Sequence, residues 1–262
     1  MRLYHAPMST CSQKVRLVLA EKGLDYESEL IDLQKGEQFA PDYLAKNPNG
    51  VVPTLEDEGR VLIESTLINE YLDDAYPRPA LKPDAAADRH AMRLWCKRID
   101  ELHPACGVQT YAIGIRPGLM RRPKAEVDAL VEAIPDPARR AARRSVVDRG
   151  IEAPEFASAY AAHVTLFDRA EETLADAPYL TGVAFTLADA AFLPYVLRVD
   201  HLNLVGLLRG RSALDDWYRR VQERPSYHTA VGAHLAEPAV AAFRRAGEAV
   251  ADEVARIAAA SR

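Results

Sequence analysis

Several features that would assign this 262-residue chain to a class at once are missing. It has only three cysteines, Cys11, Cys96 and Cys106, which are too few and too widely spaced for a disulfide framework or a structural zinc site. Such thiols favour a reducing, cytoplasmic setting. No apolar run approaches the ~20 residues that span a bilayer, and the charged start lacks the apolar run of a secretory signal. We therefore expect no membrane as partner.

A basic excess, which would indicate a nucleic-acid partner, is missing too. The chain has 33 Lys and Arg against 38 Asp and Glu, a net charge of −5, whereas general nucleic-acid binders show a basic excess. The seven histidines show no His-Glu-x-x-His or comparable spacing, so no metal site is predicted. Gly-x-Ser-x-Gly, Gly-x-Gly-x-x-Gly and Walker motifs are absent too. Glycine is scarce, at 13 residues, whereas alanine and arginine are plentiful, a composition that favours helix.

The first 80 residues alternate between strand and helix patterns. An order of strand, helix, strand, short helix, two hairpin strands and a final helix is predicted. The predicted elements are a strand at 2–5, a helix at 14–22, a strand at 26–33, a short helix at 42–46, hairpin strands at 51–55 and 60–63, and a helix from Ser65. Asn47-Pro48-Asn49-Gly50 is a strong turn signal between them.

A proline-rich stretch from Tyr76 to Pro83 marks the best domain boundary in the chain. Beyond it strand signals nearly vanish. Long amphipathic helices are predicted at 85–111 and 157–174, and a capping box, Thr186-Leu187-Ala188-Asp189, starts an apolar helix. Residues 116–154 predict short helices and loops, and residues 236–260 predict a solvent-facing helix or a frayed tail. The predicted domains are residues 1–78 and 84–262.

Four motifs, in this order and at this spacing, resemble the glutathione S-transferases of the serine type, and the resemblance covers nearly the whole chain. They are Pro7-Met8-Ser9-Thr10-Cys11-Ser12-Gln13-Lys14-Val15-Arg16, Asn47-Pro48-Asn49-Gly50-Val51-Val52-Pro53-Thr54-Leu55, Glu64-Ser65-Thr66-Leu67-Ile68-Asn69-Glu70-Tyr71-Leu72 and Thr186-Leu187-Ala188-Asp189. The segments 111–115 and 134–140 further resemble the β-aryl-etherase-like and related fungal subgroup. The resemblance implies an α/β thioredoxin-like domain followed by an all-α helical bundle domain.

The resemblance implies that Ser9 is the catalytic residue. The thiol of glutathione, with a free pKa of ~8.5, must be ionised before it attacks. A helix N-terminus stabilises an anion through its unpaired N–H groups and partial positive charge, and a serine hydroxyl there can donate a hydrogen bond to a thiolate. The alternative is that Ser9 and Ser12 are only N-caps, and Ser12 remains a second candidate for the thiol contact.

Cys11 is the other candidate nucleophile. A cysteine at a helix start can have a depressed pKa and form a mixed disulfide with glutathione. The alternative is a small, partly buried thiol that packs under the helix. No Cys-x-x-Cys motif is present, so dithiol chemistry is not expected.

The resemblance also implies the residues that hold glutathione. Val52 and Pro53 match the family's cis-proline, which turns the Val52 backbone towards the cysteinyl part of the tripeptide. Glu64 and Ser65 begin the next helix, where the dipole and the Ser65 N–H suit the γ-glutamyl carboxylate and Glu64 suits its ammonium group. Gln38 matches a position that often contacts the glycyl end. For each of them an ordinary structural role is the alternative.

A hydrophobic small-molecule electrophile is the expected second substrate. We expect Met8, Tyr111, Ile113 and Ile115 to line its pocket, because such pockets are mostly apolar; the alternative is that Tyr111 and Ile113 are core at helical spacing. The run Arg139, Arg140, Arg143 and Arg144 is expected to form a solvated helix face, with an anionic-ligand gate as the second interpretation.

The sequence thus predicts a cytoplasmic glutathione transferase whose bound thiolate attacks an electrophile, expected to be aromatic and aryl-ether-like. A homodimer is expected by analogy with the family, with apolar residues around Leu67 and Leu72 at the interface. Two alternatives are a thiol transferase or deglutathionylase that depends on Cys11, and a non-catalytic binding protein that retains the fold.

Overall fold

The computed structural model describes residues 1–260, which group into two compact units that interleave along the chain. Unit 1 contains residues 1–100, 172–194 and 213–235, and unit 2 contains residues 101–171, 195–212 and those from 236 on. The predicted boundary between residues 78 and 84 follows chain order instead, and it stays a prediction.

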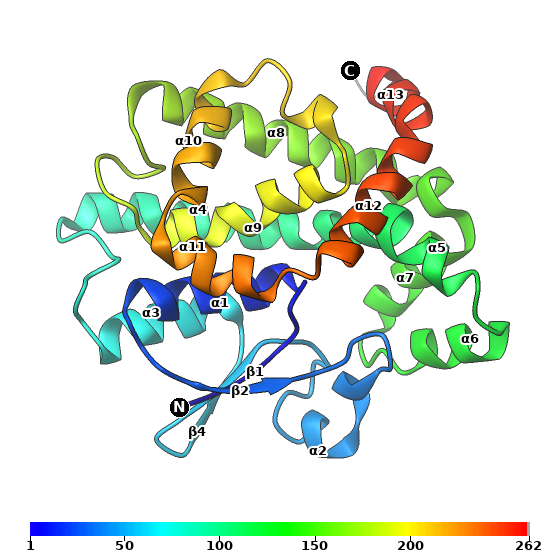
Figure 1. The fold of residues 1–262 in the computed structure, drawn as a ribbon, viewed down its shortest axis with the longest axis horizontal. Coiled ribbons are helices and arrows are strands. Elements are labelled where there is room, and N and C mark those ends of the chain that lie inside the picture. The colour runs from blue at the N-terminus through cyan, green and yellow to red at the C-terminus, as the bar shows by residue number, and fades with distance from the viewer. Residues whose placement is uncertain (261–262) are drawn as a thin grey trace. The chain divides into compact units, whose positions relative to one another are not determined.

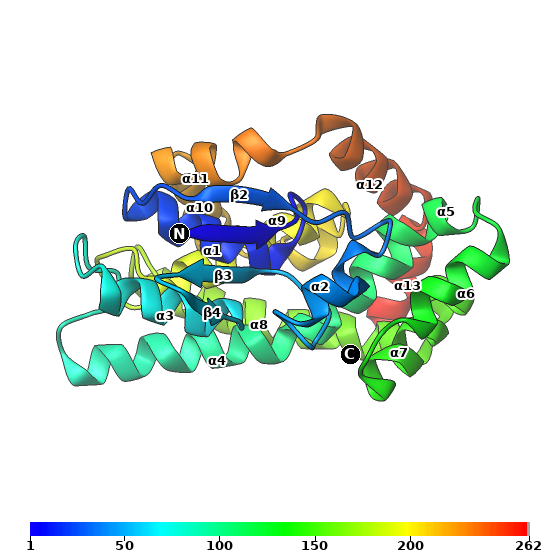
Figure 2. The same cartoon turned by 90° about the horizontal axis from the view of Figure 1, so that it is seen from below.

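Unit 1 is built on a four-stranded mixed sheet in the order β2-β1-β3-β4 (Figure 2). The strands are β1 (Arg2–His5), β2 (Glu27–Leu30), β3 (Thr54–Asp57) and β4 (Arg60–Leu62). β1 pairs in parallel with β2 and antiparallel with β3, with Tyr4 opposite Thr54, and β3 and β4 form the predicted hairpin. The predicted order of strands and helices is confirmed. β2 ends before the predicted residue 33, because the Asp32 carboxylate accepts hydrogen bonds from the N–H groups of Gln34 and Lys35 and turns the chain.

Helices cover both faces of this sheet. Figure 1 shows α1 and α3 on one face and α2 on the other, and α1 packs against α3 and α11. The helices of unit 1 are α1 (Thr10–Glu21), α2 (Pro41–Leu44), α3 (Ser65–Ala75), α10 (Ser212–Gln222) and α11 (Pro225–Ala230), with 3-10 turns η1 (Glu37–Phe39) and η5 (Gly232–His234). α1 begins four residues earlier than predicted, because Ser9 caps it.

The predicted capping box at residues 186–189 organises a buried polar region of unit 1. The Asp189 carboxylate accepts hydrogen bonds from the Thr186 N–H at 3.0 Å and from its hydroxyl at 3.1 Å, and the Thr186 hydroxyl accepts from the Ala188 N–H at 3.3 Å. The other carboxylate oxygen accepts from the Leu180 N–H and the Trp217 indole N–H. Asp189 and Trp217 are fully buried, so these bonds satisfy a carboxylate that has no access to water.

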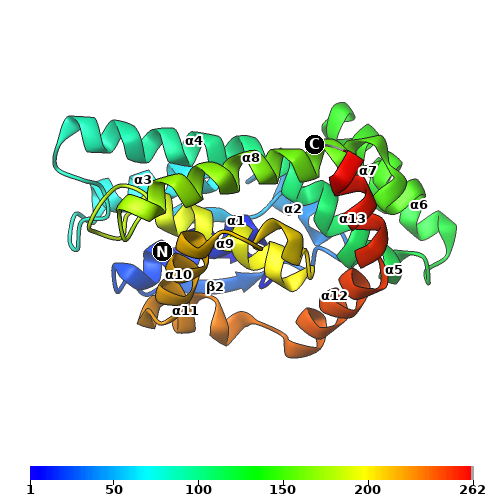
Figure 3. The ribbon, with the colours of Figure 1, turned by 90° about the horizontal axis from the view of Figure 1, so that it is seen from above.

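Unit 2 is helical, as predicted. The helices α4 (Ala86–Gln109), α8 (Pro154–Asp176) and α9 (Leu187–His201) are divided between the two units. Unit 2 otherwise contains the π-helical turn η2 (Thr110–Ile115), α5 (Arg116–Leu119), α6 (Lys124–Glu132), α7 (Pro137–Arg149), η3 (Gly150–Glu152), η4 (Val205–Leu207), α12 (Glu237–Ala249) and α13 (Ala251–Ala260). Figure 3 shows α6 and α7 side by side. Beyond residue 80 the described part pairs strand-like backbone only at Tyr179 and Gly182.

The C-terminal segment is more than the solvent-facing helix or frayed tail that its alanine-rich sequence predicts. It forms α12 and α13, with Phe243, Gly247 and Val254 buried. Gly247 allows this packing, because a Cβ there would lie 1.9 Å from the Leu202 carbonyl oxygen. None of the helices in residues 1–260 combines the length and apolar character that a membrane span requires.

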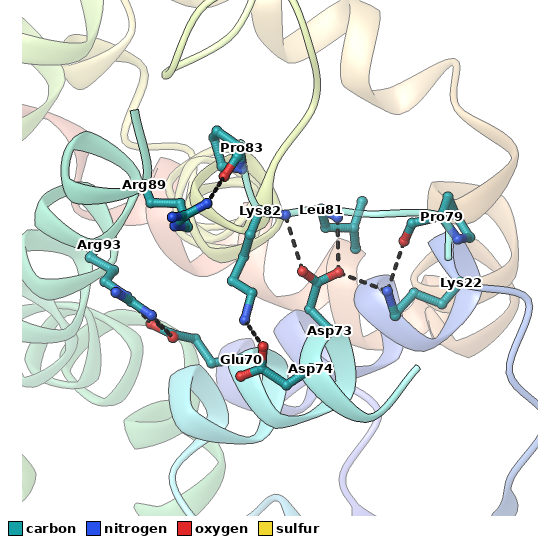
Figure 4. Close-up of polar contacts among 10 residues, drawn as sticks. All are labelled: Lys22, Glu70, Asp73, Asp74, Pro79, Leu81, Lys82, Pro83, Arg89 and Arg93. Carbon is teal, nitrogen blue, oxygen red and sulfur yellow. Dashed lines mark hydrogen bonds and ion pairs between the residues drawn. The ribbon is translucent and has the colours of Figure 1, made fainter. Parts of the chain in front are cut away.

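A buried ion pair holds the proline-rich segment that follows α3 (Figure 4). The Lys22 ammonium donates to the Asp73 carboxylate and to the Pro79 carbonyl, both at 2.7 Å, and Asp73 also accepts from the N–H groups of Leu81 and Lys82. The Lys22 and Asp73 side chains are 0% and 4% exposed. The adjacent Asp74, which pairs with the Lys82 ammonium, is 70% exposed.

We predict that Asp73→Ala lowers the free energy of unfolding by about 3–5 kcal/mol, because it leaves the buried Lys22 ammonium without its counter-charge. Asp74→Ala is the matched control and should change that free energy by less than about 1 kcal/mol. Urea unfolding of both variants measures the difference. Equal losses in the two variants would contradict the assigned role of the buried pair.

Candidate active site

The loop between β1 and α1 carries the predicted nucleophile-activating serine. Ser9 is the N-cap of α1, and its Oγ accepts a hydrogen bond from the Ser12 N–H at 3.2 Å. The side chain is half-buried, and its O–H donates to no acceptor among the residues described. The first turn of α1 contains no acidic residue, so the helix terminus keeps its partial positive charge. A ligand anion at this point meets a free hydroxyl donor and a helix N-terminus together.

The two alternative candidates on α1 lie in different surroundings. Cys11 is a half-buried thiol in the first turn. Ser12 is fully buried, and its Oγ accepts a hydrogen bond from the Ala6 N–H at 3.3 Å, which closes the loop around Ser9. Of the other two cysteines, Cys96 lies in the interior, where burial raises the pKa of its thiol to about 12.

Arg16 holds the loop before Ser9, a role that the sequence analysis did not assign to it. Its guanidinium is 1% exposed and donates to the carbonyls of Ala6 (3.2 Å) and Pro7 (2.9 Å), which precede Ser9, and to that of Ala230 (2.7 Å). Burial lowers its pKa to about 10, which still leaves it charged at neutral pH. An arginine among the apolar positions of a helix is the sequence signal that could have revealed it.

His5 completes this buried polar cluster beneath the loop. Its Nδ1 lies 3.0 Å from an Arg16 guanidinium nitrogen, and its Nε2 lies 2.8 Å from the Ser28 hydroxyl. Burial, followed by the charge of Arg16 and the neighbouring His234, lowers the pKa of His5 to about 3. The imidazole is therefore neutral at physiological pH and accepts at Nδ1 from the guanidinium.

The segment before β3 lies beside this loop. The antiparallel register sets Tyr4 opposite Thr54, and Ala6 and Val52 pack in one buried cluster. The Val52–Pro53 peptide bond is cis, as the family resemblance implies. The preceding Val51 carbonyl accepts from the Tyr43 hydroxyl and the Asn47 amide, at 2.7 and 2.9 Å.

Tyr43 and Asn47 support the cis-proline segment, a role that the sequence analysis did not assign to them. Both are buried, and both also contact the Thr54 hydroxyl. Burial raises the pKa of Tyr43 to about 12, so its hydroxyl stays protonated and can donate. In the turn that follows Asn47, Gly50 has a φ of +58°, and a Cβ there would meet the Phe39 ring at 2.9 Å. Only glycine fits both conditions.

The start of α3 carries Glu64 and Ser65, the residues predicted to bind the γ-glutamyl group. Glu64 precedes the helix with a φ of +69°, a conformation that is strained for a non-glycine residue and that clusters at ligand sites. Its exposed carboxylate accepts a hydrogen bond from the Asn49 amide at 3.2 Å. Ser65 opens the helix and is nearly buried, and no acidic residue lies in the first turn.

The starts of α1 and α3 are joined through one carboxylate. Asp100 accepts from the Lys14 ammonium of α1 at 2.7 Å and from the Thr66 hydroxyl of α3 at 2.8 Å. The Asn69 amide of α3 also donates to the Lys14 carbonyl at 3.4 Å. Unit 1 therefore fixes two positive helix termini relative to each other, and a ligand with two anionic groups suits that pair.

Gln38 lies in η1, ahead of the short helix α2. Its side chain is buried, and its Oε1 has no hydrogen-bond partner within residues 1–260. A buried acceptor without a donor costs about 1–3 kcal/mol, so such groups in native structures need an explanation. A ligand N–H can supply the missing donor.

The predicted pocket residues are divided between the units. Met8 is half-buried in unit 1, whereas Tyr111, Ile113 and Ile115 belong to η2 in unit 2. Ile113 is buried, and Tyr111 and Ile115 pack against an apolar cluster formed by Leu119, Val127, Val131 and Val147. A shared pocket of these residues stays a prediction. No group of three or more His, Cys, Asp or Glu in the described part of the chain could hold a metal ion.

Comparisons with known proteins agree over most of the chain. Residues 3–80 match the family described as glutathione S-transferase, N-terminal domain, and residues 126–225 match glutathione S-transferase, C-terminal domain. Glutathione S-transferase 3 of Zea mays is 32% identical over 239 residues, which cover 89% of this chain and 94% of that protein.

A bacterial relative is similar in both sequence and structure. Protein LigF of Sphingobium sp. (strain NBRC 103272 / SYK-6) is 32% identical over 198 residues, which cover 72% of this chain and 75% of that protein. The crystal structure of the β-etherase LigF from strain SYK-6 matches with a TM-score of 0.80 at 27% identity, covering 88% of this chain and 98% of that chain.

Proposed function

The chain belongs to the glutathione S-transferase family and is an enzyme that uses glutathione as co-substrate, and from this premise we propose that Ser9 activates the glutathione thiol. One observation carries the proposal: the Ser9 Oγ caps α1 by accepting from the Ser12 N–H. The oxygen accepts a hydrogen bond from the helix, and the hydroxyl proton remains available to donate to a thiolate at the helix N-terminus.

The rest of unit 1 offers a partner for each part of the tripeptide. The backbone of Val52, beside the cis bond to Pro53, pairs with the cysteinyl residue as an added strand would. Ser65, at the start of α3, receives the γ-glutamyl carboxylate, and the exposed Glu64 carboxylate receives the ammonium group. The unpartnered Oε1 of Gln38 accepts the N–H of the glycyl residue.

Geometry favours Ser9 over Ser12 and leaves Cys11 as the rival. The Ser12 hydroxyl is fully enclosed and holds the Ala6 N–H. Cys11 is half-buried at the same helix terminus, which keeps a mixed-disulfide mechanism as the rival activity. The rival differs in its nucleophile, because a Cys11 thiolate would attack glutathione disulfide bonds itself.

The electrophile is proposed to be an aryl ether. The similarity to the β-etherase LigF supports this class. The glutathione thiolate attacks the carbon that carries the aryloxy group, a C–S bond forms, and the C–O bond breaks. The phenolate leaves with the electron pair and takes a proton from solvent. The half-buried side chains of Tyr111 and Ile115 in unit 2 are proposed to bind its apolar body.

A homodimer in the cytoplasm is the proposed assembly and location. Leu67 of α3 is 63% exposed, and Val61, on the edge strand β4, is also exposed. Exposed apolar residues on neighbouring elements suit a self-complementary interface. Leu72, also expected near the interface, is fully buried within the chain.

Ser9→Ala is predicted to raise the pKa of the bound glutathione thiol by about one to two units, because it removes one hydrogen bond to a charged group, which contributes about 1.5–3 kcal/mol. Turnover at neutral pH should fall about ten- to hundredfold, and glutathione affinity should fall less. The pH dependence of thiolate absorbance with glutathione bound measures the pKa. Cys11→Ala is the matched control and should have a mild effect. The reverse pattern, with activity lost only in Cys11→Ala, would establish the rival mechanism.

Incubation with a β-aryl ether and glutathione is predicted to release the phenol and form a glutathione thioether in equal amounts. Mass spectrometry of both products, with an enzyme-free control, checks the reaction class. If the enzyme conjugates 1-chloro-2,4-dinitrobenzene but leaves every β-aryl ether intact, the transferase assignment stands and the ether class is wrong.

Sedimentation velocity at micromolar concentration is predicted to show a particle of twice the chain's mass. Leu67→Glu should shift it to the monomer, because a charge in an apolar interface is costly. The exposed Leu30→Glu on β2 is the control and should leave the dimer intact. A monomer for the unaltered chain would contradict the proposed assembly.

A further inference from the structure

We propose that Arg143 and Arg139 on α7 form a subsite in unit 2 that binds the carboxylate of an aromatic substrate. The inference rests on the proposed function, because it names the class of compound that the transferase receives. It concerns half of the arginine run in residues 139–144, whose expected role was a solvated helix face.

The four arginines of the run divide into two pairs with opposite surroundings. Arg140 and Arg144 face α6: Arg144 pairs with Asp128 at 2.6 Å and with Glu132 at 3.5 Å, and Arg140 lies 3.9 Å from Glu132. Although burial lowers the pKa of Arg144, its bond to Asp128 raises it above the ordinary value. This pair is neutralised within the fold.

Arg139 and Arg143 lie four residues apart, and both are near Tyr111 of η2. The Asp136 carboxylate favours the charge of Arg139. The Arg143 guanidinium carbon lies over the Tyr111 ring, 3.0 Å from its centroid, so the cation contacts the aromatic face. Within residues 1–260 Arg143 forms no ion pair with a carboxylate, and Tyr111 is the one neighbour that favours its charge. Burial lowers the pKa of Arg143, and so does the charge of Arg139.

The position of Arg143 is unfavourable unless an anion completes it. Like charges at i and i+4 destabilise a helix, and a half-buried guanidinium loses hydration that an aromatic face only partly replaces. Tyr111 contacts the Arg143 guanidinium, whose N–H groups form a fork that can match a carboxylate in two hydrogen bonds.

The surroundings indicate that the carboxylate belongs to an aromatic compound. Tyr111 and Ile115 are half-buried and pack against the apolar cluster of Leu119, Val127, Val131 and Val147, which suits a ring more than a free inorganic anion. Tyr111 lies in the π-helical turn η2, and such turns are frequent at functional sites.

The test compares phenoxyacetate with its uncharged isostere phenoxyacetamide, each titrated calorimetrically into the full-length protein without glutathione. The unaltered protein should bind the acid at least about tenfold more tightly than the amide. Arg143→Gln should weaken acid binding by about ten- to hundredfold, the range for hydrogen bonds to a charged group, and change amide binding little. Arg143→Lys, which keeps the charge and loses the fork, should give an intermediate affinity.

Arg149→Gln is the matched control, because it removes an exposed charge from the last turn of the same helix, and it should bind the acid normally. If Arg143→Gln does not fold, Arg139→Gln serves in its place with the same expected direction. Equal affinity for acid and amide, or an equal loss in Arg149→Gln, would overturn the subsite. Turnover of the neutral electrophile 1-chloro-2,4-dinitrobenzene by the unaltered enzyme tests the transferase function separately, so the two failures are distinguishable.

Discussion

One buried cation, Arg16, fixes the conformation of the loop that carries Ser9, the residue on which the proposed active site depends. Its guanidinium holds the carbonyls of Ala6 and Pro7, just before Ser9, and ties them to the Ala230 carbonyl at the end of α11. A buried charge is tolerated only where hydrogen bonds replace its hydration. The loop therefore has one favourable arrangement, in which its carbonyls face inward to the arginine and the Ser9 side chain caps α1.

Buried polar groups stabilise the rest of unit 1 in the same way. Asp189 joins α9 to Trp217, Lys22 and Asp73 hold the proline-rich segment, and Asp100 joins the starts of α1 and α3. Each of these groups connects segments that are far apart in the chain. The apolar core supplies most of the driving force for folding, but it does not determine which backbone groups face a ligand. These polar connections determine the positions of the two helix termini to which we assign the thiolate and the γ-glutamyl carboxylate of glutathione.

The order of elements in the first 80 residues and the capping box at Thr186 could be predicted, because local patterns of hydrophobicity, turns and caps determine them. The family was predicted too, because four motifs in sequence order are specific. The roles of Arg16, Tyr43 and Asn47 were missed. Those of Tyr43 and Asn47 depend on contacts with a backbone carbonyl that no local pattern encodes, whereas Arg16 left a signal, an arginine among the apolar positions of its helix. The buried positions of the tail were not predicted for a related reason: Gly247 lies against Leu202, and Phe243 lies against Gly114. Likewise, the difference between the two arginine pairs of α7 appears only in the structure, where α7 contacts both α6 and η2.

The central claim is that the hydroxyl of Ser9, and not the thiol of Cys11, contacts the thiol of bound glutathione. A crystal structure of the enzyme with bound glutathione tests it most directly. The account predicts the glutathione sulfur within about 3.5 Å of the Ser9 Oγ, at hydrogen-bond distance for a sulfur acceptor, with the Ala6 and Pro7 carbonyls still held by Arg16. A sulfur bonded to the Cys11 Sγ, or one lying beyond hydrogen-bond reach of Ser9, would contradict it.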